Sequence, residues 1–301
     1  MWCDQTAIIQ AVEICLNNPT QFEGLAQFAA LLYTSKQCTE AQKPQFLQQA
    51  KAQAKQLAVV ETSEFMADLW LYKLGNSFNY AGLLEEAVAA YDMALAINPE
   101  KYEALNNKGC VLHGLGRYED AISIYKKALN IKPHGHDSLY NKGIALGYLG
   151  RYQEAIAAYD DALFIKPNNY SALNNKGDAL RNLGRYEEAI ATFDAALDIK
   201  PNLHEAWDNL GYTLAKAGQV DEAIAKFDQA IGINTQYANA VYNKAFALSL
   251  KENLDEVCSL LQQAFTLDPK YRDMAKTDTD FDSIRADERF RALVEGDDQL
   301  A

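Results

Sequence analysis

The sequence is poor in basic residues, in cysteine and in long apolar runs. Lys and Arg number 28 against 41 Asp and Glu, a net charge of −13; because a nucleic-acid backbone is bound by a basic face, we expect no nucleic-acid partner. The five cysteines are odd in number and form no Cys-x-x-Cys pair, which favours free thiols in a reducing compartment over a disulfide framework. No apolar run reaches the ~18 residues typical of a membrane span. No basic segment followed by an apolar core begins the sequence, so we expect a cytoplasmic protein without membrane contact.

Groups that carry chemistry are also scarce. Of the 4 histidines, two form the string His134-Gly135-His136, which lacks further ligands at metal-binding spacing and is more typical of a polar loop. No phosphate-binding loop, nucleophile elbow or catalytic triad is found. An active site within residues 1–67 is disfavoured because that segment has no histidine and few carboxylates. The sequence therefore predicts a non-enzymatic protein with no cofactor and no metal site.

Proline is sparse but regularly placed. Five of the 7 prolines lie 34 or twice 34 residues apart, and Thr235 stands at the skipped position; the five are Pro99, Pro133, Pro167, Pro201 and Pro269. A fixed period of this length is the signature of a repeat architecture. The sequence therefore predicts one structural unit repeated along the chain.

Each unit shows two apolar helical faces separated by a glycine turn. A unit counted from three residues after proline has an apolar residue at its fourth position, Gly or Ala at its eighth, and Leu or Phe at its eleventh. A second face of Ala or Val, an aromatic or Leu, and Ala follows. These spacings place the residues on one side of each helix, and a small eighth residue lets two helices approach closely. The units are 68–101, 102–135, 136–169, 170–203, 204–237 and 238–271.

Acidic pairs recur just before the second face, for example Glu119-Asp120 and Glu187-Glu188. Paired carboxylates can serve as a general acid and base, but these fall in the first turn of a helix. Negative charge there complements the helix dipole, so we interpret them as structural.

The Leu-Gly-Leu-Ala-aromatic-Ala-Pro pattern resembles the tetratricopeptide repeat (TPR) family over residues 68–271. The resemblance implies an all-α fold, a right-handed α-solenoid of helix-turn-helix units whose first helices line the concave surface. Residues 272–301 are similar to the tail that follows TPR arrays in some bacterial proteins, and we expect a capping helix built on Ile284, Phe290 and Leu293, then an acidic end. Residues 1–67 fit the period poorly, and two interpretations stay open: a helical N-terminal cap or a small adaptor.

An asparagine row is the main candidate site. The sixth residue of successive units is polar; the six are Lys73, Asn107, Asn141, Asn175, Asn209 and Asn243. The resemblance places this row along the concave groove, where an amide donor and acceptor can pair with the backbone of an extended peptide. The alternative is that each asparagine bonds to a neighbouring helix, and both can hold at once.

Neighbouring groove positions would set selectivity. Those predicted to line the groove beside the row are Tyr72, Asn76, Tyr140, Asp178, Asp208, Tyr212 and Tyr242. Acids outnumber bases among these positions, so the sequence predicts a polar or basic extended segment as the partner. The lysine and arginine clamp that TPR co-chaperones use is absent in this register, since Tyr72, Asp137 and Asn141 occupy its positions.

The sequence therefore predicts a protein–protein interaction scaffold that binds an extended segment of a partner. The alternative is an assembly module that self-associates, or docks an effector, through its N-terminal helices. Neither the identity of the partner nor the oligomeric state follows from the sequence.

Overall fold

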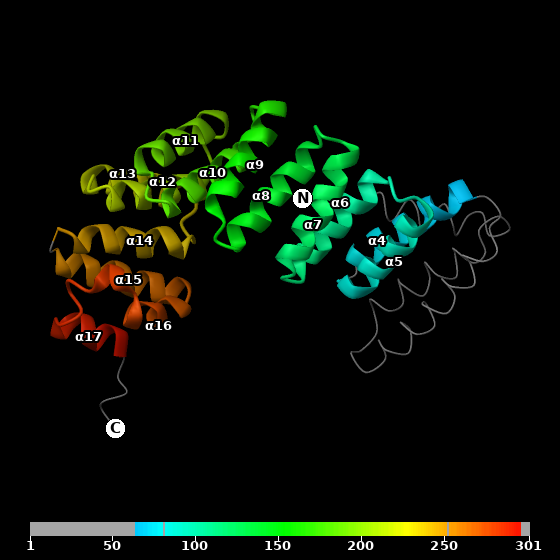
Figure 1. Cartoon of the computed structure of the whole chain (residues 1–301). Helices are drawn as coiled ribbons and strands as arrows, with labels where there is room; N and C mark the ends of the chain where they lie inside the picture. The colour runs from blue at the N-terminus through cyan, green and yellow to red at the C-terminus, as the bar shows by residue number, and fades with distance from the viewer. Residues whose placement is uncertain (1–63, 81, 252, 296–301) are drawn as a thin grey trace, which may run out of the picture. The chain divides into compact units, whose positions relative to one another are not determined.

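A computed structural model describes residues 64–80, 82–251 and 253–295 (Figure 1). Every regular element within these ranges is helical. The predicted N-terminal cap or adaptor, residues 1–67, lies outside the described residues except for its last four. The chain forms two compact units, residues 1–145 and 146–301.

Within its described residues, the first unit holds two complete helix pairs and most of one further helix. Each pair is joined by a tight turn, and the pairs stack so that the two first helices, α4 and α6, also touch. The elements are α4 (Glu64–Tyr80), α5 (Leu84–Ile97), α6 (Tyr102–Gly114), α7 (Tyr118–Ile131) and α8 (His136–Tyr148). Helix α4 begins four residues before the expected repeat start at 68, whereas α6 begins at the expected residue.

The second unit continues the same alternation. Its first helices α10, α12 and α14 touch in succession, and each packs against its own second helix. The elements are α9 (Tyr152–Ile165), α10 (Tyr170–Asn182), α11 (Tyr186–Ile199), α12 (His204–Lys216), α13 (Val220–Ile233), α14 (Ala238–Ser249), α15 (Leu254–Leu267), α16 (Lys270–Thr277), the short 3₁₀ helix η1 (Thr279–Phe281) and α17 (Glu288–Glu295). The predicted all-α architecture of stacked helix pairs is confirmed.

The turns that contain Gly82, Gly116, Gly150, Gly184 and Gly218 are Schellman motifs. Gly116, with φ +74°, donates its N–H to the carbonyl of His113 at 2.9 Å, and the next N–H, of Arg117, reaches back to Leu112 at 2.9 Å. This left-handed conformation is open to glycine at little cost. The Arg117 side chain then pairs with Asp120 in the first turn of α7. The acidic pairs therefore lie at helix starts, as predicted.

The helices of a pair touch through a glycine and an aromatic ring. A Cβ added at Gly109 would lie 2.4 Å from the Tyr125 ring, which is buried. The same close approach recurs at Gly75 against Tyr91, Gly177 against Phe193 and Gly211 against Phe227. The small eighth residue is thus required by the ring that fills the space between the helices, as expected from the sequence.

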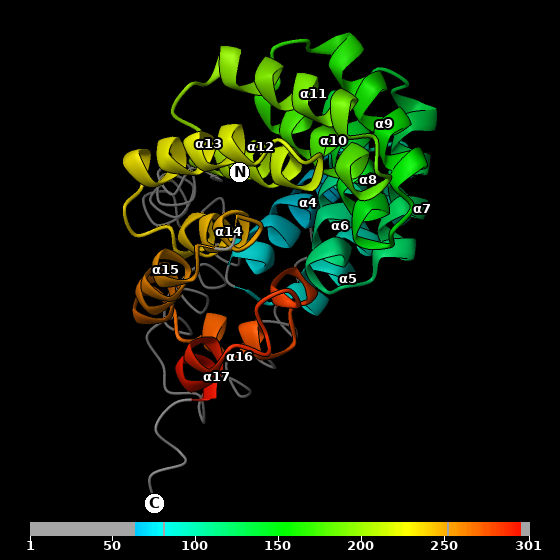
Figure 2. The same ribbon diagram turned by 90° about the vertical axis from the view of Figure 1, so that its left-hand side faces the viewer.

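The C-terminal segment covers the last repeat. Helices α16 and α17 pack on α15 (Figure 2). The short helix η1 packs on α14. Their buried apolar residues are Tyr271, Ala275, Phe281, Ile284, Phe290 and Val294. Ile284 and Phe290 were predicted for this role. Ile284 precedes α17 rather than lying on it, and Val294 is buried in place of Leu293, which is only half-buried.

Candidate binding surface

The first helices present a shared side within each unit, which we call the first-helix face. It comprises the fifth, sixth and ninth residues of each repeat and therefore contains every predicted groove residue. Most of these side chains are half-buried, while Lys73 is exposed, and Asp208, Tyr242 and Phe246 are buried. Because first helices touch one another, residues from successive repeats can bond across this face.

In the first unit the asparagine row bonds backward along the array. Asn107 donates its amide N–H to Asn76 at 2.9 Å and to the Tyr72 hydroxyl at 3.3 Å. The same Asn76 oxygen accepts from the Tyr91 hydroxyl at 2.7 Å. Three predicted groove residues therefore belong to one hydrogen-bonded cluster that ties the second repeat to the first.

The next repeat repeats this arrangement with sulfur as the acceptor. Asn141 donates to the Cys110 sulfur at 3.2 Å, and the Tyr125 hydroxyl approaches the same sulfur at 3.5 Å. Burial raises the pKa of the Cys110 thiol, and the nearby Asp137 charge acts in the same direction. The thiol is thus neutral and serves as a packing and hydrogen-bonding group.

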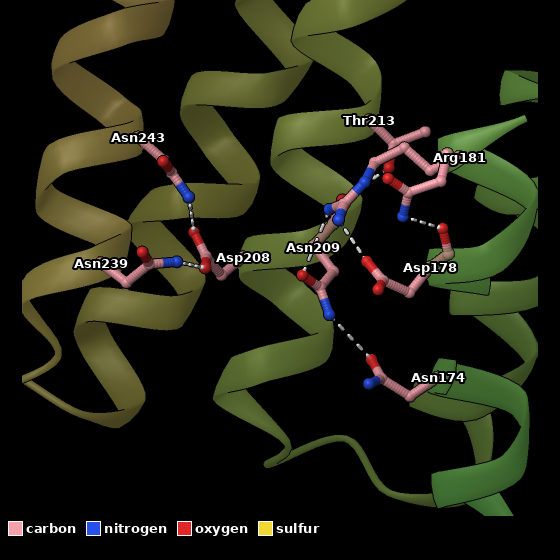
Figure 3. Close-up of polar contacts among 9 residues, drawn as sticks. Asn174, Asp178, Arg181, Asp208, Asn209, Thr213, Asn239 and Asn243 are labelled. Carbon is pink, nitrogen blue, oxygen red and sulfur yellow. Dashed lines mark hydrogen bonds and ion pairs between the residues drawn. The ribbon is translucent and has the colours of Figure 1, made fainter. Parts of the chain in front are cut away.

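In the second unit the face is charged between α10 and α12 (Figure 3). Asn209 donates to Asn174 at 3.2 Å and accepts from Arg181 at 3.4 Å. Arg181 also pairs with Asp178 on its own helix, and its guanidinium lies 5.1 Å from the centre of the Tyr212 ring. The carboxylate of Asp178 is therefore already neutralised by an arginine.

Asp208 is the centre of a buried polar cluster rather than an exposed groove residue. Its side chain accepts from Asn243 at 2.9 Å and from Asn239 at 2.5 Å (Figure 3), and only 1% of the residue is exposed. Burial raises the pKa of Asp208, although the two amides act to lower it. Asp208 was expected to line an exposed groove, but its carboxylate faces α14 because the amides of that helix supply its hydrogen bonds.

The chain's own C-terminal segment lies on the far end of this face. The Tyr242 hydroxyl donates to Asp278 at 2.8 Å, and the Tyr212 hydroxyl donates to Asp280 at 2.9 Å. Lys216 pairs with the same Asp280, and Phe281 packs edge-on against the Tyr242 ring at 5.3 Å. Tyr242 was expected to be an open groove residue, but this contact buries it.

This contact was not predicted from the sequence. Residues 272–301 were predicted to cap the array, but no contact was assigned to Asp278 or Asp280, and their partners lie 36 and 68 residues away. The one available signal was the alternation of two acids followed at once by an aromatic residue.

The asparagine row thus makes the neighbour contacts that the alternative interpretation expected. Asn107 donates two bonds to the preceding first helix, and Asn141, Asn209 and Asn243 donate one each. An amide has two N–H donors and a carbonyl oxygen that can accept twice. Each half-buried amide therefore keeps capacity for a further bond. Asn175 and Tyr140 are also half-buried on this face.

The residues that the structure describes lack two further features. Within them, histidine, cysteine and carboxylate side chains do not gather in threes at a distance suited to a metal ion. None of the helices described is both long and apolar enough to cross a bilayer.

Known proteins were compared with the chain. Models of the tetratricopeptide repeat family match residues 140–204, residues 65–134 and 103–167, and residues 204–237, which together extend over more than half of the sequence. No curated protein sequence matches.

Solved structures of similar fold are numerous. YrrB, described as a TPR protein with an unusual peptide-binding site, is 26% identical and matches 60% of this chain and 93% of its own, with a TM-score of 0.50. MamA is 25% identical, matching 55% and 96% with a TM-score of 0.52. PilW, a type IV pilus biogenesis factor, is 21% identical, matching 72% and 97% with a TM-score of 0.62; this likeness shows the fold alone. The period, the helix pairs, the glycine–aromatic contacts and the family matches agree that the chain belongs to the tetratricopeptide repeat family.

Proposed function

We propose that this protein is a non-enzymatic interaction scaffold whose first-helix face binds an extended segment of a partner protein. The observation that carries the proposal is the asparagine row, in which half-buried amides recur at one position of successive repeats. Repeated faces of this kind make extended binding surfaces. The peptide-binding site named for YrrB supports the same use of the fold.

The amides suit the backbone of an extended chain. A peptide backbone presents one N–H and one carbonyl per residue, and an asparagine can answer both. Since the amides of Asn107, Asn141, Asn209 and Asn243 are already held by bonds to the preceding repeat, they are oriented before a partner arrives. Binding then costs less side-chain entropy than it would with free side chains.

The experiment uses peptides selected from a random display library on the full chain. The variant carries Asn141→Ala, Asn175→Ala and Asn209→Ala. Each lost hydrogen bond costs roughly 0.5–1.5 kcal/mol, so with three bonds lost we expect the selected peptides to bind about 10- to 1,000-fold more weakly in fluorescence anisotropy.

The matched control replaces asparagines that lie off the face. Asn168 and Asn202 are exposed in the links between repeats, and their replacement by alanine should leave peptide affinity unchanged. Circular dichroism establishes that each variant is folded. Equal affinity of the selected peptides for the wild-type and triple-asparagine proteins would show that the face is not the binding surface.

A further inference from the structure

Residues 278–281 contact first-helix residues that the sequence predicted would bind a partner. Tyr212 is the ninth residue of one repeat, and Tyr242 is the fifth residue of the next. Each donates a hydrogen bond from its hydroxyl to this segment. The face at α12 and α14 therefore already holds a short polypeptide stretch, and the contacts show what chemistry it accepts.

That chemistry is acidic. The groups pointing at the segment are donors: two tyrosine hydroxyls and the Lys216 ammonium. Burial, together with the hydrogen bond to Asp280, raises the pKa of Tyr212, so its hydroxyl stays protonated and donating. The Asp280 side chain is only 11% exposed. A carboxylate is thus held from two sides, with an aromatic ring packed one residue further on.

The acids of the same face do not oppose such a ligand. Asp178 is paired with Arg181, and Asp208 is buried among amides. Arg181 and Lys216 both lie over the Tyr212 ring, at 5.1 and 5.3 Å. A basic partner was predicted because acids outnumber bases among the groove positions. Since these two acids are already paired or buried, that count overstates the negative charge that a ligand would meet here.

Space for a longer ligand adjoins the contact. An open cavity of about 330 Å³ lies between the ends of α12 and α14 and the segment. Phe246 and Leu250 form its apolar side, while Lys216 and Asp280 lie at its polar side. A bulky side chain next to the acidic pair could extend into this cavity.

We propose that residues 278–281 act as an internal ligand, and that the partner segment for this end of the face is acidic with an adjacent aromatic residue, binding where the chain's own segment now lies. This inference rests on the proposed function and names the class of its partner. Residues 278–281 and the partner segment compete for the tyrosine hydroxyls of α12 and α14 and for Lys216. The internal ligand thus limits access of a partner to the face.

The experiment weakens the internal ligand and offers it again in solution. The full chain carries Asp278→Asn and Asp280→Asn, which leave Tyr212, Lys216 and Tyr242 in place. The probe is a fluorescein-labelled peptide of residues 276–287. Because charged hydrogen bonds are stronger than neutral ones, we expect the peptide to bind the variant at least about tenfold more tightly than it binds the wild-type protein.

Three controls accompany the measurement. Adding Tyr212→Phe to the variant removes one donor and keeps the ring, and should cancel most of the gain. Asp273→Asn changes an exposed acid of α16 that pairs with Lys276, and should behave as wild type. A probe with asparagine at both acidic positions should bind more weakly than the native probe.

The outcomes separate this inference from the proposed function. If the folded double variant binds the probe no better than the wild-type protein does, residues 278–281 are a structural cap only and the inference is wrong. If the asparagine probe binds equally well, the acidic partner class is wrong. Display-selected peptides that still depend on the asparagine row would leave the proposed function standing in either case.

Discussion

Replacing Gly177 by alanine should destabilise the second unit despite the better helix propensity of alanine. A Cβ at this position would meet three atoms of the Phe193 ring at 2.8 to 2.9 Å, and the ring is fully buried. Alanine gains about 1 kcal/mol in helix propensity, whereas overpacking a rigid core costs roughly 1–3 kcal/mol. The difference is a net loss of up to about 2 kcal/mol, and we expect about 1 kcal/mol.

The sixth repeat supplies the compensating change. There the same two positions hold Ala245 and Leu261, both fully buried, so a Cβ is accommodated where the ring is replaced by leucine. Phe193→Leu alone leaves a cavity and costs about 1–2 kcal/mol. The pair Gly177→Ala with Phe193→Leu should lose less than the sum of the single variants, by about 1–2 kcal/mol of coupling.

The assay is urea unfolding followed by circular dichroism for the wild-type chain, the two single variants and the double variant. Hydrogen exchange of the α10 and α11 amides localises the effect to the altered pair. If the two losses add to within about 0.3 kcal/mol, the steric account of the glycine–aromatic contact is refuted.

Two more predictions concern the second unit. Gly184→Ala places a side chain at φ +72° and should lower the free energy of unfolding by about 1 kcal/mol. Gly232 lies inside α13 with open space around it, so Gly232→Ala should raise the free energy of unfolding by about 0.5–1 kcal/mol. Thermal unfolding of both variants measures the two effects. Asp208→Asn should change the pH dependence of stability, because a folded-state pKa above the ordinary value of 3.8 makes the folded protein bind the proton more tightly than the unfolded chain. The wild-type free energy of unfolding should therefore fall relative to the variant as pH rises from about 3.8 through the folded pKa, and parallel curves from pH 3.5 to 7 would contradict this.

Local spacing was enough to predict the repeat and its packing. The Gly109–Tyr125 contact joins residues 16 apart within one unit, and both belong to patterns of fixed period. The Asn107 position was predicted on the face for the same reason. Its bond to Asn76 was left open, because the partner lies on another repeat and the choice depends on how closely two first helices approach.

The return of the C-terminal segment onto α12 and α14 was beyond such an analysis. Asp280 lies 68 residues, twice the repeat period, after Tyr212, but it belongs to the segment after the array, where the apolar pattern of the repeat is lost. A tail of alternating acids is also well hydrated, so its composition predicts that it is exposed to solvent. Only the three-dimensional path of α16 and η1 brings the carboxylate under the tyrosine hydroxyl.

The fit between the C-terminal segment and the sixth repeat bears on how such a chain can lengthen. Asp278 and Phe281 are matched to Tyr242, while the fifth position is Asn106 and Asn174 in other repeats. A gene duplication that appends a copy of an asparagine-bearing repeat after α15 would separate the closing piece from its tyrosine. Duplications placed upstream keep that pairing, so the array is free to grow from within and constrained at its end.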